Sequence, residues 1–442
     1  MALPDVEQAA ARVQERVRRA LASVPRHGRA GRVEEALGLV VAAHGPRARV
    51  GEVCRVEAPG GPVPAEVVGF RRGRTLLMPL GRMDGVEPGA WVEALDRALT
   101  VRVGAGILGR IVGPLGEPAD GGPMWRVEEE RPLAARPPEA LARPPIRERL
   151  WVGVRAIDHL LTCGRGQRLG IFAGSGVGKS TLLGMIARHN RAAVTVLALI
   201  GERGREVREF LEHELGEEGR RRAVAVVATS DEPPLLRLKA AETATAIAEF
   251  FRDRGEDVVL LMDSLTRYAM AGREVGLAAG EPPATRGYPP SVFAGLPRLV
   301  ERAGPAARGS ITAFYTVLVE GDDMNEPVAD AVRGLLDGHI VLSRRLASEH
   351  QFPAIDVLES VSRLMPKVAD TRTLEAAERV RRLLAVYRDA ADLIQVGAYQ
   401  PGSDPEVDAA RALRPRILAF LRQRPEEPPG TVALADVLEA AS

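Results

Sequence analysis

The stretch from Phe172 to Thr181, FAGSGVGKST, decides the fold of this chain of 442 residues. It follows the apolar run at 168–172 and leads into TLLGMIARH at 181–189, which has helical spacing. A strand, a glycine-rich loop, Gly-Lys-Ser and a helix in this order are the context of a phosphate-binding loop. The glycines let backbone N–H groups turn inward around a phosphate, and the helix N-terminus adds its positive end. We therefore predict a P-loop that binds a nucleotide.

The expected nucleotide contacts come from this loop and the first helical turn, and they are Gly174, Ser175, Gly176, Val177, Gly178, Lys179, Ser180 and Thr181. We expect Lys179 to reach the β- and γ-phosphate oxygens and the Ser180 hydroxyl to be a ligand of Mg²⁺. The general pattern has glycine where this chain has Ala173. A methyl group fits there if the residue keeps a negative φ.

Two carboxylates extend the predicted site. Asp263 ends the apolar run 258–262, where a carboxylate typically holds Mg²⁺ and its water beside a P-loop. Glu202 follows the run 194–200, at the edge of a parallel sheet where ligands bind, and could activate the attacking water. The structural alternatives are a plain strand terminus for Asp263 and a solvated charge run, GERGRE, for Glu202.

The periodicity of the chain predicts three kinds of structure. Residues 32–95 hold short β-branched runs separated by Gly and Pro, at 37–41, 52–56, 66–70 and 75–78, which is typical of a small barrel. Between 151 and 346 apolar strands alternate with helical stretches, and we expect strands at 168–173, 194–200, 223–229, 258–263, 310–319 and 338–343. That alternation predicts a mostly parallel sheet covered by helices. Beyond residue 370 the chain has helical spacing, interrupted at 397–405.

Two further segments complete the predicted organisation. Residues 3–24 space apolar side chains as an amphipathic helix, which either packs on its own domain or docks a partner helix or an acidic lipid surface. Residues 127–146 hold five prolines and read as an extended connection. We predict a helix at 1–25, a barrel at 26–97, a P-loop core at 98–370 and a helical domain at 371–442.

Composition excludes some classes of protein. The chain has 60 Lys and Arg against 59 Asp and Glu, and a net charge of +1 provides no field to hold a nucleic acid. Its longest apolar runs are far shorter than the roughly 20 residues of a membrane span, and the N-terminus does not resemble a secretory signal. Cys54 and Cys163 are isolated, which favours a reducing cytoplasm.

The motifs together resemble one family. FAGSGVGKS, IGERGREV, DSLTRYAMAGREVGLAAGEPPATRGYPPSVF, SITAFYTVLVEGDD and DGHIVLSRRLA are similar to segments of the protein-export ATPases of flagellar and type III secretion systems. These are relatives of the subunits of rotary ATP synthases, and the flagellar members are the best match. The resemblance runs from about residue 30 to about residue 425. It implies an α/β, RecA-like P-loop core, and alanine at position 173 is what this family carries.

The resemblance also implies roles for single residues. Glu202 matches the catalytic glutamate, Arg203 a phosphate-proximal arginine and Arg267 a γ-phosphate sensor, with a structural ion pair as the alternative for both arginines. Phe352 in QFPAID matches an aromatic against the adenine face, with a plain core phenylalanine as the alternative. Tyr399 is a weaker match for the other side of that pocket. Arg363 matches the arginine that the family inserts into the neighbouring subunit's site, where it would neutralise charge on the transferred phosphoryl group.

A site completed by a neighbour implies a ring, and the family indicates a homohexamer. The expected partners are export substrates and their chaperones, a stator or regulator protein on the N-terminal helix, and a membrane export gate. The expected location is the cytoplasm, peripheral to the inner membrane at the base of the export apparatus.

Three other functions compete with flagellar export. The first is a type III injectisome ATPase, which has the same motifs. The second is a Rho-like RNA motor, which needs aromatics among basic residues; the 32–95 region offers Phe70 and Trp91, and aromatics are 4% of the chain. The third is a non-catalytic rotary ATPase subunit, and Glu202 argues against it.

Overall fold

A computed structural model describes residues 13–16, 28–319, 321, 323–430 and 432–439. The chain divides into two compact units, residues 1–99 with 277–281, and residues 100–276 with 282–442. The helix predicted at 3–24 lies outside the described residues except for 13–16, which are helical. No helix within the described ranges is both long and apolar enough to cross a membrane.

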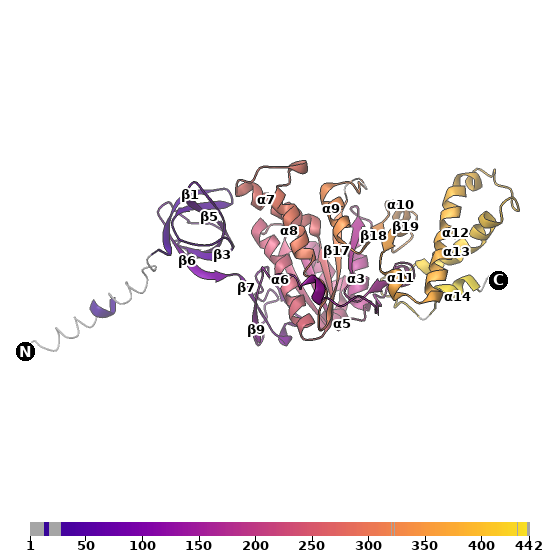
Figure 1. Cartoon of the computed structure of the whole chain (residues 1–442), viewed down its shortest axis with the longest axis horizontal. Helices are drawn as coiled ribbons and strands as arrows, with labels where there is room; N and C mark the ends of the chain where they lie inside the picture. Colours follow the sequence, from indigo (N-terminus) through magenta and orange to yellow (C-terminus); the bar gives the residue numbers. More distant parts are fainter. Residues whose placement is uncertain (1–12, 17–27, 320, 322, 431, 440–442) are drawn as a thin grey trace, which may run out of the picture. The chain divides into compact units, whose positions relative to one another are not determined.

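The first unit contains a closed six-stranded barrel with the order β1-β2-β5-β4-β3-β6 (Figure 1). Its strands are β1 (Ala30–Leu37), β2 (Val40–His44), β3 (Glu52–Val56), β4 (Val63–Arg71), β5 (Arg74–Pro79) and β6 (Trp91–Ala98). Alternate side chains fill the interior, among them Val41, Val67 and Leu77, none of which is exposed. The barrel prediction is confirmed.

One predicted barrel strand was wrong. The run 37–41 is not one strand, because Leu37 ends β1, residues 38–39 form the turn, and Val40 and Val41 begin β2. Gly38 lies between them with a φ of 58°, the left-handed region that favours glycine. Leu37 is 74% exposed, so the apolar run that suggested a strand includes a side chain at a hairpin tip.

The second unit is built on a nine-stranded sheet with the order β19-β18-β12-β17-β15-β13-β14-β8, and β16 pairs with β17 outside this path. The central strands pair in parallel, as predicted, in the order β18-β12-β17-β15-β13-β14. β19 is antiparallel to β18, and β16 is antiparallel to β17. The strands are β8 (Ile111–Val112), β12 (Arg168–Ala173), β13 (Val194–Glu202), β14 (Ala223–Thr229), β15 (Asp257–Asp263), β16 (Gly304–Pro305), β17 (Ser310–Leu318), β18 (Gly338–Leu342) and β19 (Ile355–Ser362).

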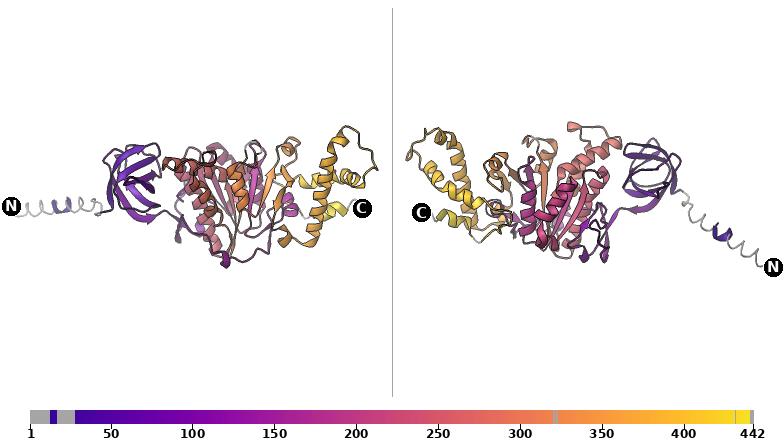
Figure 2. Two further views of the ribbon diagram at one scale, coloured as in Figure 1. Left: turned by 45° about the horizontal axis from the view of Figure 1, so that its top comes forward. Right: turned by 180° about the vertical axis from the view of Figure 1, so that it is seen from behind.

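Helices cover both faces of this sheet (Figure 2). The chain moves one way along the sheet from β12 to β14 and returns from β14 through β15 and β17 to β18. Because crossovers between parallel strands are right-handed, the two directions place helices on opposite faces. The first group is α3 (Lys179–His189), α4 (Gly204–Glu209), the π-helical turn η3 (Phe210–Glu214) and α5 (Gly216–Arg221), and the second is α6 (Pro234–Asp253), α7 (Leu265–Ala278), η4 (Thr285–Gly287), α8 (Pro290–Val300) and α9 (Pro327–Leu335).

The predicted extended connection at 127–146 contains a strand that the sequence did not indicate. β9 (Glu129–Pro132) pairs with β7 (Thr100–Val103), and the short 3-10 turns η1 (Ala105–Ile107) and η2 (Ala140–Ala142) precede and follow it. The rest of the connection is held to the core by polar contacts. Arg143 donates to the backbone oxygens of Glu301 and Ala303, so this segment runs along the surface as a strap.

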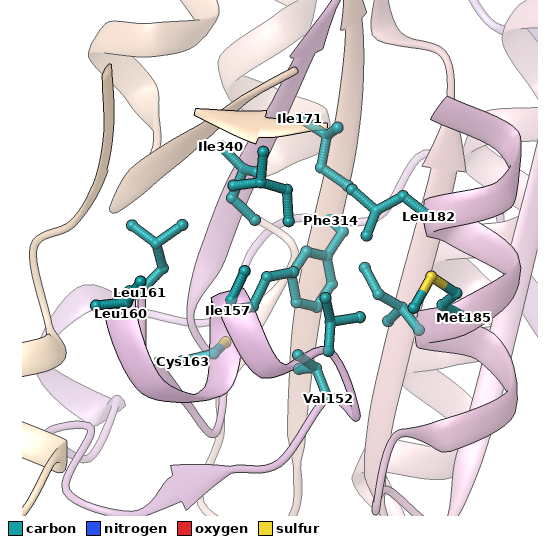
Figure 3. Close-up of a cluster of buried hydrophobic side chains, with 14 of the residues drawn as sticks. Val152, Ile157, Leu160, Leu161, Cys163, Ile171, Leu182, Met185, Phe314 and Ile340 are labelled. Atoms are coloured by element: carbon teal, nitrogen blue, oxygen red, sulfur yellow. The ribbon is translucent and has the colours of Figure 1, made fainter. Parts of the chain in front are cut away.

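The C-terminal part is helical beyond Asp370, as predicted. Its helices are α12 (Thr371–Gln395), α13 (Pro405–Leu421) and α14 (Leu434–Glu439), and short elements before them are β10 (Arg149–Leu150), α2 (Arg155–Leu160), β11 (Cys163–Gly164), α10 (Arg344–Ser348) and α11 (Met365–Val368). One apolar cluster joins these helices to the sheet. Figure 3 shows its centre, where Phe314 of β17 lies between Ile157 of α2 and Leu182 of α3.

Candidate nucleotide site

The P-loop joins β12 to α3. Ala173 is the last residue of β12, so its extended backbone accommodates the methyl group that departs from the general pattern. Gly176 and Gly178 have φ values of 79° and 90°, which a residue with a side chain rarely adopts. None of the backbone N–H groups from Gly174 to Ser180 donates a hydrogen bond to another described residue. These free donors at a helix N-terminus form a cradle that fits a phosphate.

The three predicted charged residues meet at this loop. The Lys179 ammonium group donates to Asp263 and lies 3.5 Å from Glu202 Oε1. Glu202 is the last residue of β13, and Asp263 the last of β15, the strand beside it. Because parallel strands present their carboxyl ends at one edge, both carboxylates reach the P-loop lysine. Asp263 also accepts from Thr316 Oγ1 at 2.6 Å.

The surroundings of Glu202 favour a basic carboxylate. Burial raises the pKa of Glu202 above its ordinary value, and the charge of Asp263 acts in the same direction. Lys179 and Arg267 oppose this shift in the pKa. Arg267 packs beside Gly201, and its buried Nε has no hydrogen-bond acceptor among the described residues. The net direction gives a carboxylate with more affinity for a proton than an exposed glutamate has.

A pocket of about 230 Å³ opens beside these residues. It lies between the carboxyl edge of the sheet and the segment formed by α4 and η3. Five of its lining residues are acidic, and the full set is Ser180, Leu199, Glu202, Glu206, Val207, Glu209, Phe210, Glu214 and Asp263.

Ser180 and Asp263 both line this pocket, which suits the predicted Mg²⁺. No cluster of three or more His, Cys, Asp or Glu side chains able to hold a metal occurs within the described residues. Mg²⁺ typically takes one or two protein oxygens and completes its shell with water and substrate phosphates. A hydroxyl and one carboxylate beside a phosphate cradle are therefore a donor set that fits the ion.

Glu214 and Thr316 are site residues that sequence reasoning missed. Thr181 Oγ1 donates to Glu214 Oε1 at 3.1 Å, so the π-helical turn is tied to the first turn of α3. A side chain on Gly184 would collide with Glu214, which explains glycine at this position. Thr316 could have been found as a polar residue within the apolar run of β17, next to the strand that ends at Asp263.

Phe352 also lies at the P-loop. It precedes β19, whose first residue, Ile355, pairs with Leu342 at the carboxyl end of β18. The ring would be 3.8 Å from a Cβ placed on Gly178, and the side chain is 43% exposed. A phenylalanine with that exposure is not a core residue, and its open face is available to a planar ligand.

The structure does not bring the other three predicted residues into this cluster. Arg203 is exposed and pairs with Glu206 at 3.2 Å. Tyr399 donates to the Asp404 backbone oxygen and to Asp408, each at 3.0 Å, so its described partners belong to the C-terminal helices.

Arg363 and the P-loop lie at opposite ends of the parallel strands. The Arg363 backbone N–H donates to Asp337, and Ser362 pairs with Gly338 at the amino end of β18. The P-loop follows the carboxyl end of the neighbouring β12, about four strand residues or roughly 13 Å further along. Arg363 is exposed, and its guanidinium makes no hydrogen bond or ion pair with another described residue.

Family models match most of the chain. Residues 33–96 match the β-barrel domain of the ATP synthase alpha/beta family, and residues 153–362 match its nucleotide-binding domain. Residues 369–440 match the C-terminal domain of the T3SS EscN ATPase.

Curated relatives and solved structures match at similar levels. The flagellum-specific ATP synthase of Bacillus subtilis is 54% identical over 90% of this chain and 92% of its own. The type 3 secretion system ATPase of Xanthomonas euvesicatoria is 51% identical over 92% of each chain. The assembled ATPase EscN of enteropathogenic E. coli is 47% identical, with a TM-score of 0.87, over 93% of this chain and 98% of its own.

Proposed function

The chain belongs to the flagellar and type III secretion export ATPases of the ATP synthase alpha/beta family, and from this membership we propose that it hydrolyses Mg-ATP in a ring to deliver or unload export substrates. The type 3 secretion relatives are named as ATPases and the flagellar ones as flagellum-specific ATP synthases. The site carries a P-loop with a lysine and two carboxylates at one sheet edge. The coupling to export rests on the family.

Each residue of the cluster has a proposed role. The N–H cradle of Gly174 to Ser180 and the Lys179 ammonium group hold the phosphates. Lys179 exchanges Asp263 for phosphate oxygens when nucleotide binds, which frees Asp263 and leaves it beside Ser180. These two residues would hold Mg²⁺, which neutralises charge on the phosphates. Glu202 orients the attacking water and accepts its proton, and its raised pKa suits that task.

The position of Arg363 supports a shared active site. Strand geometry separates it from its own P-loop by more than an arginine side chain spans. An exposed guanidinium that makes no hydrogen bond or ion pair with another described residue is available to a second subunit. We propose that it stabilises the phosphoryl group bound to the neighbouring chain. The solved relative EscN is described as assembled, and a homohexameric ring would place an Arg363 at every site.

A complementation assay tests the shared site. Glu202→Gln and Arg363→Ala subunits each hydrolyse ATP only slowly alone, but mixing them raises hydrolysis, because about a quarter of randomly mixed interfaces join two intact halves. The matched control mixes Arg363→Ala with the double variant Glu202→Gln/Arg363→Ala, which supplies no intact Arg363. Equal hydrolysis in both mixtures at every ratio contradicts the proposal. Wild-type activity per subunit should also rise with protein concentration.

The export system itself is either flagellar or injectisome. Flagellar relatives match at 51–54% identity and injectisome relatives at 50–51%. We propose flagellar export as the first candidate, and deletion of the gene tests it. Loss of swimming with intact effector secretion supports flagellar export, whereas loss of effector secretion with intact swimming supports the injectisome.

The proposed partners follow the same family. EscN has been solved with its central stalk EscO, and we propose a stalk protein, a regulator at residues 1–25, substrates with chaperones, and a cytoplasmic location beside the membrane export gate. A pull-down with and without residues 1–24 tests the regulator, while ATP binding should be unaffected.

A further inference from the structure

Phe352 is not held in place by a hydrophobic core. The side chain is 43% exposed, and its ring lies over Gly178 of the P-loop. A partly exposed aromatic in a loop samples more positions than a core residue, and fixing it during ligand binding costs conformational entropy. The position of the ring must therefore depend on how the backbone on either side is held.

The backbone around Phe352 is held from two directions. On one side the Gln351 N–H donates to the oxygen of Leu346 in α10 at 2.9 Å. On the other side the Gln423 N–H donates to the Phe352 oxygen at 3.0 Å, and Arg422 Nε donates to Gln351 Oε1 at 2.8 Å. Arg422 and Gln423, called the 422–423 clamp below, therefore grip two successive residues of the loop.

Gln423 is itself fixed by a satisfied buried amide. Its side chain is 4% exposed. Its Oε1 accepts from the Arg155 N–H, and its Nε2 donates to the Gly153 and Glu427 oxygens, each at 2.9 Å. A buried amide with these partners is costly to move, because any displacement leaves polar groups unpaired.

The residues that precede the clamp are packed into the apolar cluster. The clamp directly follows α13, whose last residues Phe420 and Leu421 belong to the apolar cluster shared with α2 and the sheet. Phe420 also makes an edge-to-face contact with His159 of α2 at 5.3 Å between ring centroids. The C-terminal helices thus provide a rigid base from which the clamp reaches the nucleotide site.

We propose that Arg422 and Gln423 are positioning residues for nucleotide binding, which hold Phe352 over the P-loop so that its ring stacks on the base. This inference rests on the proposed binding of ATP and on the contact between Phe352 and the base that the family resemblance implies. It assigns part of the affinity for the base to the segment after α13, more than 240 residues beyond the P-loop in the sequence.

Calorimetric titration with ADP and with pyrophosphate separates base from phosphate binding. Arg422→Ala and Gln423→Ala weaken ADP binding about tenfold, the range for losing one stacking aromatic, and leave pyrophosphate binding unchanged. In steady-state assays the KM for ATP rises while kcat stays within about twofold. Arg422→Lys, which can still donate to Gln351, restores much of the affinity. Arg424→Ala is the matched control, since the Arg424 side chain makes no hydrogen bond or ion pair with the loop among the described residues.

A double-variant comparison identifies Phe352 as the route. Phe352→Ala weakens ADP binding to the same extent, and Arg422→Ala adds nothing in that background. If Phe352→Ala weakens ADP binding but the clamp variants do not, the inference is wrong. If Phe352→Ala has no effect, the base contact is wrong and the inference that rests on it is wrong as well. Equal loss of ADP and pyrophosphate binding in the clamp variants indicates general damage to the fold and also contradicts the inference.

Discussion

The two ends of the core sheet present opposite kinds of charged site. At the carboxyl end, Lys179, Glu202 and Asp263 are largely buried and contact one another. Towards the amino end, Arg363 is exposed and its guanidinium has no hydrogen bond or ion pair among the described residues. The first site is organised by the chain alone, and the second has the features of a group whose counterpart lies on another molecule.

This difference separates what one subunit does from what an assembly does. Binding and water activation depend on groups that the fold already brings together, so they should be lost whenever those groups change. The contribution of Arg363 should depend on assembly. The following variants test that contrast.

The largest effect is expected from Glu202→Gln. The amide keeps the size of the side chain but cannot accept the proton of the attacking water, so kcat falls about 10³-fold. ATP binding is retained, because Lys179 and the loop are intact. Single-turnover hydrolysis and ADP titration measure the two properties. A fall in binding equal to the fall in kcat contradicts the assignment.

Arg363→Ala is expected to lower kcat about 10²-fold in assembled protein, the cost of losing one strong donor to the transition state. Diluted, unassembled subunits should bind ATP as well as wild type does. Arg363→Lys recovers only part of the rate, because an ammonium group cannot span two phosphate oxygens as a guanidinium does. An ATP-binding defect in isolated Arg363→Ala subunits would place this residue in its own chain's site.

The pH dependence of kcat reports on Glu202. Burial raises the pKa of this carboxyl group, so it takes up a proton at a higher pH than an exposed glutamate does. Below that pKa the base is lost, and kcat falls about tenfold per pH unit. The acid limb of the profile should therefore lie above the ordinary glutamate range. A flat profile down to that range would remove Glu202 as the base.

The smallest effects concern the two arginines near Glu202. Arg267 packs beside Gly201 with its Nε buried, and Arg267→Ala is expected to lower kcat about tenfold through lost charge at the phosphates. Arg203 is 78% exposed and pairs with Glu206, so Arg203→Ala should change kcat less than about threefold. Steady-state assays compare the kcat values of the two variants. A larger fall in kcat for Arg203→Ala than for Arg267→Ala would indicate that Arg203 is the arginine closer to the phosphates.

Elements with a strong local signal were predictable from the sequence. The predicted strands 168–173 and 223–229 have the same first and last residues as β12 and β14. Apolar runs bounded by turns show where buried strands begin and end. β8 and β9 were missed, since strands of two and four residues with half-exposed side chains leave no periodic pattern. β19 was missed because its alternation is interrupted by Glu359 and Ser360.

The residues of the site also fall into a group that local sequence predicts and a group that it does not. Lys179, Glu202 and Asp263 follow from motifs at strand ends, because parallel topology alone brings such ends together. Glu214 and the 422–423 clamp reach the site by packing between distant segments, and nothing in their local sequence marks them. Tyr399 shows the converse, since a resemblance suggested a pocket residue whose described contacts lie among the C-terminal helices.

The P-loop lysine has a consequence for protein chemistry. The chain has three lysines, and of the other two Lys239 is 7% exposed while Lys367 is exposed. A Lys367→Arg variant would leave two side-chain amines, both largely buried, of which only Lys179 belongs to the P-loop. Acylation of Lys179, located by mass spectrometry in that variant, would report on the nucleotide site, and its protection by bound nucleotide would measure the occupancy of the site.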